Sequence, residues 1–253
     1  MEHITAKGLV IRETPFGEAD CYITVLTEQL GKIEVLCRGV RRKKGRLANA
    51  VRVFCYSELT LYAGRNRYTL NDASVEMQFW RITEDIEKCA LAYYFVQAAG
   101  LVADSDANMP ELLPTLLRAL YALEKQNRSV HLVKPAFELR LACLAGYQPD
   151  LSACAVCGGG EGQPSFLLEE GVLVCPSCRT RVGGTYLPLS GGTLEAMRYI
   201  VSCEGKRLFA FTMNAETAKQ LGTICERHLL YHLGQKCSAL DFYHSLFGKT
   251  GKA

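Results

Sequence analysis

The stretch that decides the fold reads Cys154-Ala-Val-Cys157 and, after seventeen further residues, Cys175-Pro-Ser-Cys178. Two Cys-x-x-Cys pairs at this separation are typical of a four-thiolate zinc site, because each pair forms a tight turn that points two sulfurs at one ion. Apolar runs on either side of Glu169-Glu-Gly171 predict a small hairpin between the pairs. Four sulfurs leave no open position for water or substrate, so we expect one structural zinc ion.

Two other interpretations fit parts of this cysteine pattern. Buried thiols on unrelated turns would give the same residues, and Cys175-Pro-Ser-Cys178 alone would fit a dithiol redox centre. The redox motif belongs near a βαβ pattern, however, and here a second pair lies within reach to complete a metal site. Zinc deaminases need a His-x-Glu element earlier in the chain, and no histidine here has glutamate two positions later. Nothing in the sequence indicates an enzyme.

Composition places the chain among ordinary globular proteins. It has 253 residues, of which 49% are hydrophobic and 22% charged. Eight of the twelve cysteines lie outside the motif, scattered among apolar residues, and we interpret them as small core residues of a protein in the reducing cytoplasm. The longest nearly uncharged stretch, 89–103, is too short to span a membrane, so we expect a buried helix there and no membrane association.

The first 80 residues predict β structure. Ile33, Val35 and Cys37 alternate with polar residues, as in a half-buried strand. A three-stranded meander, a longer connection and a final hairpin give the strand order of an OB-type barrel, although other small five-stranded barrels fit the same pattern. The expected strands are 6–13, 19–27, 32–38, 51–62 and 68–73.

From about residue 82 the apolar spacing becomes helical. Ile82, Ile86, Cys89, Tyr93 and Val96 fall on one face of the first expected helix. Further helices are expected at 113–123, 133–144, 194–201 and 215–233. The predicted fold is therefore α+β and multidomain. We divide it into an OB-fold nucleic-acid-binding domain at 1–80, a helical domain at 81–150 and 183–253, and an inserted four-cysteine zinc element at 151–182.

The positive charge of the chain is concentrated in one predicted loop. Residues 1–80 hold twelve Lys and Arg against nine Asp and Glu, which accounts for the whole net charge of +3. Like charges packed this densely repel one another unless a polyanion such as a nucleic acid neutralises them. A solvated loop without a partner is the alternative. The candidate nucleic-acid-binding residues are Arg38, Arg41, Arg42, Lys43, Lys44 and Arg46 in this loop, with Arg65 and Arg67 in the next hairpin.

Three tyrosines, Tyr56, Tyr62 and Tyr68, lie in the predicted strands beside these loops. An exposed aromatic ring can stack on a base. We nevertheless favour a place in the barrel core for all three.

The order of these parts resembles the family of the bacterial DNA repair protein RecO. The most specific likeness is the run from Phe137-Glu-Leu-Arg through Gly146-Tyr-Gln-Pro149 into Cys154-Ala-Val-Cys157. Ala6-Lys-Gly-Leu-Val-Ile, Glu18-Ala-Asp20, Gly31-Lys-Ile and Arg38-Gly-Val-Arg41 are similar to the family as well. The likeness covers nearly the whole chain.

This resemblance implies a mediator of homologous recombination. Such proteins bind single- and double-stranded DNA, anneal complementary strands, and work with RecR to load RecA onto single strands coated with the single-strand-binding protein SSB. They also bind the acidic C-terminal tail of SSB, and they act in the cytoplasm at the nucleoid. An RNA-binding or ribosome-associated zinc protein would use the same basic loop, and a protein-interaction adaptor would have little affinity for nucleic acid.

Overall fold

The computed structural model describes all residues except 1, 43–46, 65–66, 104–108, 160 and 249–253. The chain forms two compact units, Met1–Glu124 and Lys125–Ala253. The finer division into a barrel, two helical segments and a cysteine element remains a prediction. No helix in the described part of the chain has both the length and the apolar character needed to cross a membrane.

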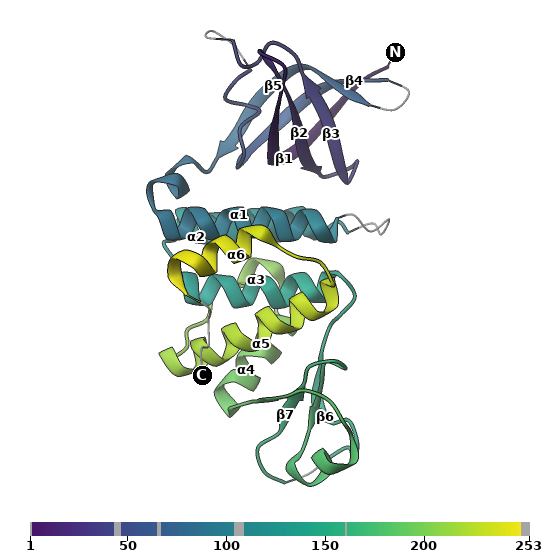
Figure 1. The fold of residues 1–253 in the computed structure, drawn as a ribbon, viewed down its shortest axis with the longest axis vertical. Helices are drawn as coiled ribbons and strands as arrows, with labels where there is room; N and C mark the ends of the chain where they lie inside the picture. Colours follow the sequence, from purple (N-terminus) through teal and green to yellow (C-terminus); the bar gives the residue numbers. More distant parts are fainter. Residues whose placement is uncertain (1, 43–46, 65–66, 104–108, 160, 249–253) are drawn as a thin grey trace. The chain divides into compact units, whose positions relative to one another are not determined.

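The first unit begins with a closed five-stranded barrel (Figure 1). Neighbouring strands follow the order β1-β2-β3-β5-β4, and β4 pairs with β1 to close it. The β3–β5 pair is parallel and the others are antiparallel. This is the predicted OB-type order, which is confirmed. The strands are β1 (Glu2–Phe16), β2 (Asp20–Thr27), β3 (Lys32–Cys37), β4 (Cys55–Ala63) and β5 (Tyr68–Gln78).

The barrel core follows the two-residue period of its strands. Leu59 and Leu61 of β4 are fully buried in it. Tyr56 and Tyr62 alternate with them and stay partly exposed on the outer face, so the prediction that they belong to the core is wrong. Tyr68 is half-buried and does pack against the core.

Residues 51–54 form turns and not the start of a strand as predicted. The amide of Ala50 donates to the carbonyl of Leu47 at 3.1 Å, and that of Cys55 donates to Arg52 at 3.1 Å. Phe54 has a φ of 69°, which is incompatible with an extended strand. Val51 and Phe54 are each only 2% exposed. The segment therefore has the buried apolar residues that are typical of a strand, although its backbone is not extended.

The barrel leads into the helices α1 (Ile86–Val102) and α2 (Leu112–Glu124) through a short 3₁₀ helix, η1 (Trp80–Glu84). Helix α1 starts later than predicted because Asp85 is its N-cap, and its carboxylate accepts bonds from the amides of Glu87 and Lys88. The predicted apolar face is wrong at two positions, since Ile86 and Tyr93 are 65% and 45% exposed. Small and aromatic residues at other positions of α1 are buried instead.

In its described residues, the second unit combines four α-helices with a small sheet. Its helices are α3 (Val130–Leu144), α4 (Gly191–Ser202), α5 (Ala215–Leu233) and α6 (Ser238–Phe247), with a short 3₁₀ helix η3 (Gly205–Arg207) after α4. The last helix was not predicted, because it is short and buries only Leu240 and Tyr243. Arg140 of α3 donates to the carbonyl of Cys203 at 2.7 Å and also bonds the carbonyl of Ile200, which joins α3 to the end of α4.

The predicted hairpin between the cysteine pairs is part of a larger sheet. Strands β7 (Ser165–Leu167) and β8 (Val172–Val174) form the hairpin itself. Strand β6 (Asp150–Cys154) pairs in parallel with β8, and β9 (Tyr186–Pro188) pairs with β7, which gives the order β6-β8-β7-β9. A 3₁₀ helix, η2 (Pro176–Arg181), follows β8.

Candidate nucleic-acid interface and metal centre

The four motif cysteines come together at the edge of the small sheet. Cys154 ends β6, Cys157 lies in the turn after it, Cys175 follows β8, and Cys178 is in η2. Gly158 adopts a φ of 71°, and its amide donates to the carbonyl of Cys154 at 2.8 Å, which closes the first turn. The two Cys-x-x-Cys turns thus meet, as their spacing predicted.

The cysteine geometry fits a tetrahedral metal site. All four Sγ atoms lie within 4.8 Å of one another, and those of Cys157 and Cys175 are 3.8 Å apart. Zinc–sulfur bonds of about 2.3 Å in a tetrahedron require sulfurs about 3.8 Å apart. Cys154, Cys175 and Cys178 are buried and Cys157 is exposed. This group can therefore bind one metal ion with four sulfurs.

The backbone around the site favours a thiolate. The amide of Cys175 donates to Sγ of Cys154 at 3.3 Å and, with other amides, lowers the pKa of Cys154 to about 6. The pKa of Cys178 is instead raised to about 12, first by its hydrogen bond with Cys175 and then by burial. The pKa of Cys175 is also lowered, first by its hydrogen bond with Ser177. The protein therefore favours thiolates at Cys154 and Cys175, whereas ionising Cys178 would need a nearby cation.

The basic loop starts from a fixed position on the barrel. The amide of Gly39 donates to Oδ1 of Asp20 at 2.7 Å, and the amide of Arg41 donates to the carbonyl of Ala19 at 3.0 Å. These bonds tie the loop entry to the β1–β2 turn. Arg38, Arg41 and Arg42 are exposed there. The predicted site residues Lys43, Lys44 and Arg46 lie outside the described residues.

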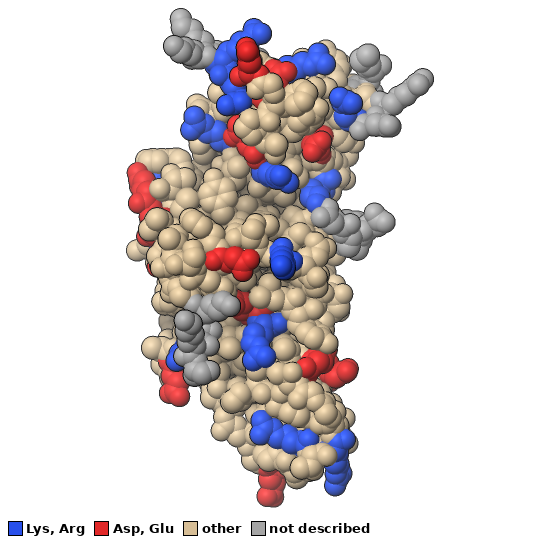
Figure 2. All heavy atoms as spheres, in the orientation of Figure 1, with Lys and Arg blue, Asp and Glu red and all other residues tan. Residues whose placement is uncertain are grey.

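Three loop arginines carry charge that no acid of the described chain neutralises. Within the described ranges, Arg38, Arg41 and Arg42 form no ion pair. Figure 2 shows Lys and Arg interspersed with Asp and Glu over this face of the barrel. On the face drawn, the described Lys and Arg residues therefore form no continuous basic patch.

The β4–β5 turn supplies a separate positive charge. Arg67 is exposed there, while Arg65 lies outside the described residues. The parallel pairing of Val35 with Tyr68 places Arg67 beside the middle of β3, whereas Arg38 follows its end. Along the direction of β3, Arg67 and Arg38 are therefore offset by four residues, which corresponds to about 13 Å. Measured along the helix axis of B-form DNA, that interval corresponds to about four phosphates of one strand.

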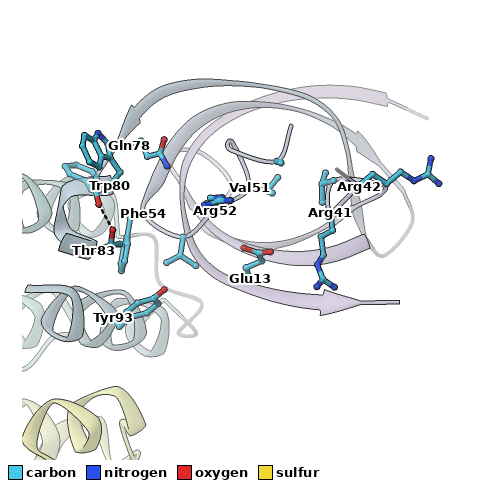
Figure 3. Close-up of a pocket in the computed structure, with 14 residues that line it drawn as sticks. Glu13, Arg41, Arg42, Val51, Arg52, Phe54, Gln78, Trp80, Thr83 and Tyr93 are labelled. Carbon is cyan, nitrogen blue, oxygen red and sulfur yellow. Dashed lines mark hydrogen bonds between the residues drawn. The ribbon is translucent and has the colours of Figure 1, made fainter. Parts of the chain in front are cut away.

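A cavity of about 640 Å³ opens beside the basic loop (Figure 3). Its described lining comes from β1, the loop between β3 and β4, the end of β5, η1 and α1. Figure 3 shows an aromatic end and a cationic end with mixed residues between them. The aromatic end holds Phe54, Trp80 and Tyr93, the cationic end Arg41 and Arg42, and Glu13, Val51 and Arg52 lie between.

The aromatic end is built on a strained residue. Phe54 is in the left-handed region, which costs a bulky residue about 1–3 kcal/mol. Its amide donates to Val10 at 3.0 Å, and its carbonyl accepts from the amide of Phe79 at 3.2 Å. Its ring meets that of Tyr93 edge to face, with centroids 4.8 Å apart. The barrel and α1 thus hold this conformation in place.

Sequence reasoning missed most of the cavity. Trp80 is 50% exposed, and the guanidinium of Arg81 lies 5.3 Å from its ring centroid. As the single tryptophan of the chain, just after a strand, it could have drawn attention. The sequence pattern instead predicted that Tyr93 lies on the apolar face of a helix and that Arg52 lies inside a strand.

The barrel and the cysteine cluster define a class: an OB-type barrel protein with a second, helical unit that carries a potential four-cysteine metal site. Comparisons with known proteins identify the family. The family model for the N-terminal part of recombination protein O matches residues 1–79, and the model for its C-terminal part matches residues 83–240. The chain belongs to the RecO family.

Individual relatives agree over nearly the full length. A DNA repair protein RecO from Acetivibrio thermocellus is 32% identical over 248 residues, covering 97% of this chain and 98% of the relative. The protein of the same name from Moorella thermoacetica is 30% identical over 96% of this chain and 91% of its own length. The one from Alkaliphilus metalliredigens is 26% identical over 91% and 94%.

Proposed function

We propose that this chain binds single- and double-stranded DNA through its N-terminal barrel and anneals complementary strands during recombinational repair. One observation carries the proposal. An OB-type barrel, a fold whose face and loops commonly bind oligonucleotides, presents Arg38, Arg41 and Arg42 with no acid partner among the described residues. Membership of a family whose relatives are named DNA repair proteins supports the same conclusion.

Annealing requires no bond chemistry from the protein. Two strands must come together while their phosphate charge is neutralised, and Lys and Arg do this without reading sequence. Exposed arginines on a loop whose first residues are bonded to the barrel suit that role. The barrel holds the start of the loop in place, and the long arginine side chains can reach the phosphates of a flexible DNA strand. In this proposal the chain has no catalytic residue, and it acts as a mediator and not as an enzyme.

The partners we propose are those that the family resemblance implied. The chain acts with RecR, binds the C-terminal tail of SSB, and so helps RecA to assemble on single strands that SSB covers. This activity takes place in the cytoplasm, at the nucleoid. We assign no residues to these protein contacts.

We further propose that the metal is one structural zinc ion held by Cys154, Cys157, Cys175 and Cys178. Four sulfurs that lie within 4.8 Å of one another, three of them on buried cysteines, support this ion, because zinc accepts four thiolates without a redox change. Bound there, it would contribute folding free energy to the small sheet, on the order of 10 kcal/mol.

A strand-annealing assay tests the function. Complementary single strands coated with SSB are mixed with the full-length chain, alone and with RecR, and duplex formation is followed by a fluorescence label. The chain should accelerate annealing, and RecA loading should need RecR as well. No acceleration, or tighter binding to structured RNA than to single-stranded DNA, would favour the RNA-binding alternative. Negligible affinity for both nucleic acids would indicate an adaptor.

A further inference from the structure

The cavity beside the basic loop combines two features that the charge pattern alone did not reveal. One end is aromatic and the other is cationic (Figure 3). We propose that it seats one unstacked base of single-stranded DNA against Trp80, with phosphates further along the same strand on Arg41 and Arg42. This inference rests on the proposed DNA binding. It specifies the part of the interface that distinguishes single-stranded from double-stranded DNA.

The aromatic end offers a stacking surface. Half of the Trp80 side chain is exposed although tryptophan is strongly apolar, and part of this exposure lies at the rim of a cavity. The exposed ring of Tyr93 lies at the same end. Every base has a π face, so aromatic platforms hold single strands without sequence preference. A base is therefore a ligand that this end can accept.

The centre of the cavity argues against a purely anionic ligand. Glu13 lies there, between the aromatic and the cationic end, so a free phosphate or a run of phosphates would meet a carboxylate inside the cavity. A base avoids this conflict at the aromatic end because it is neutral, while phosphates further along the same strand can lie at Arg41 and Arg42. Glu13 and Gln78 also provide polar atoms for the edge of a base.

The aromatic end is preorganised. The left-handed backbone of Phe54 is fixed by bonds to Val10 and Phe79, and its ring supports that of Tyr93. The carbonyl of Trp80 accepts a 2.6 Å bond from the hydroxyl of Thr83, which fixes the first turn of η1. Strain of this kind concentrates at binding sites that the surrounding structure holds in place.

The position of the cavity distinguishes it from the usual OB binding face. That face is formed by the second and third strands. None of the described lining residues belongs to β2 or β3. A strand could therefore follow the loop arginines and place one base in the cavity, apart from the common binding face.

The cavity should discriminate between single and double strands. A base inside a duplex is paired and stacked, so its face cannot reach Trp80 without the cost of unpairing. Loop arginines contact phosphates, which both forms of DNA present. Removing the indole should then weaken binding to single strands alone, whereas neutralising the arginines should weaken both.

Trp80 is the single tryptophan of the chain and reports on its own site. Intrinsic fluorescence of the full-length protein is titrated with unlabelled oligo-dT and with a blunt hairpin duplex. Affinities for both are measured in parallel by anisotropy of labelled DNA. The variants are Trp80→Ala, Trp80→Phe and the double variant Arg41→Gln/Arg42→Gln. Tyr121→Ala is the control, because Tyr121 is similarly exposed in the same unit but does not line the cavity.

We expect oligo-dT to quench the emission and the duplex to leave it nearly unchanged. Trp80→Ala should weaken oligo-dT binding about 5- to 150-fold, the equivalent of one lost stacking contact, and should leave duplex affinity unaltered. Trp80→Phe should retain most of the affinity, and Tyr121→Ala all of it.

Other results overturn the inference in distinguishable ways. If Trp80→Ala binds oligo-dT as the native chain does, while Arg41→Gln/Arg42→Gln loses affinity, the base seat is wrong and the proposed function stands. Equal losses for single strand and duplex would also refute the seat. If the native chain binds neither DNA, both proposals fail.

Discussion

The ammonium group of Lys134 on α3 lies 2.6 Å from a carboxylate oxygen of Glu226 on α5. A second carboxylate, that of Glu138, lies 2.7 Å away, and Glu226 also meets Nε2 of His244 on α6 at 2.9 Å. Lys134 and Glu138 are buried. Burial alone would lower the pKa of Lys134, but the charges of the two carboxylates and their hydrogen bonds raise it. Lys134 is therefore charged in the folded protein and links two helices of the second unit.

Replacing Lys134 with methionine should destabilise the second unit by about 3–5 kcal/mol, because two buried carboxylates lose their counter-ion. Urea unfolding followed by circular dichroism measures the change. Lys219→Met is the matched control. Lys219 is exposed on the same helix as Glu226, and its replacement should change stability by less than about 0.5 kcal/mol. Equal stability of the two variants would show that the buried charge does not support the fold.

The same group predicts a pH dependence with a definite sign. A lysine whose folded pKa is raised binds its proton more tightly in the folded state, so its stabilisation is complete below the unfolded pKa of about 10.4. That contribution is lost as pH rises further, through the folded pKa. The difference in unfolding free energy between the native chain and Lys134→Met should be constant from pH 8 to about pH 10 and shrink above it. A difference that grows between pH 8 and pH 10 would instead mean that burial dominates and lowers the folded pKa of Lys134, because the folded state would then lose the proton before the unfolded state does.

Replacing Cys157 with serine should lower the metal content of the purified protein well below one ion per chain. Serine removes one of the four sulfurs that lie within 4.8 Å of one another. Atomic absorption measures the metal, and hydrogen exchange should show loss of protection in the sheet of β6 to β9, because the proposed ion would join the two Cys-x-x-Cys turns of this sheet. Cys89→Ser serves as control, since Cys89 lies on α1, outside the cluster. Unchanged metal content in Cys157→Ser would remove this cysteine from the site.

Local patterns predicted the barrel and the cluster of four cysteines well. Leu59 and Leu61 alternate with polar neighbours, so the sequence itself shows the buried face of β4. The cysteine spacing likewise predicts that the four sulfurs lie close together, and the structure shows that they do. Both signals are short-range, because a strand period and a Cys-x-x-Cys turn are set within a few residues.

The cavity could not be predicted in the same way. Phe54 and Val51 are buried and apolar, yet turns and a left-handed backbone shape their segment. Trp80 and Tyr93 belong to η1 and α1, and they come together with Arg41 only when the barrel closes and the helix packs beside it. Helix α6 was missed for a related reason: its two buried residues give too weak a period to stand out.

The salt dependence of DNA binding tests the central claim most directly. Binding constants of the native chain and of Arg41→Gln/Arg42→Gln are measured over a range of salt concentrations. Lys206→Gln/Arg207→Gln, an exposed pair after α4, is the charge-matched control. If both loop arginines contact phosphates, the slope of log K against log salt should flatten by about 1.4 for single strands and about 1.8 for duplex, whatever the sequence. The control should keep the native slope. A loop variant with an unchanged slope, or a control that flattens equally, would contradict the assignment of DNA binding to this loop.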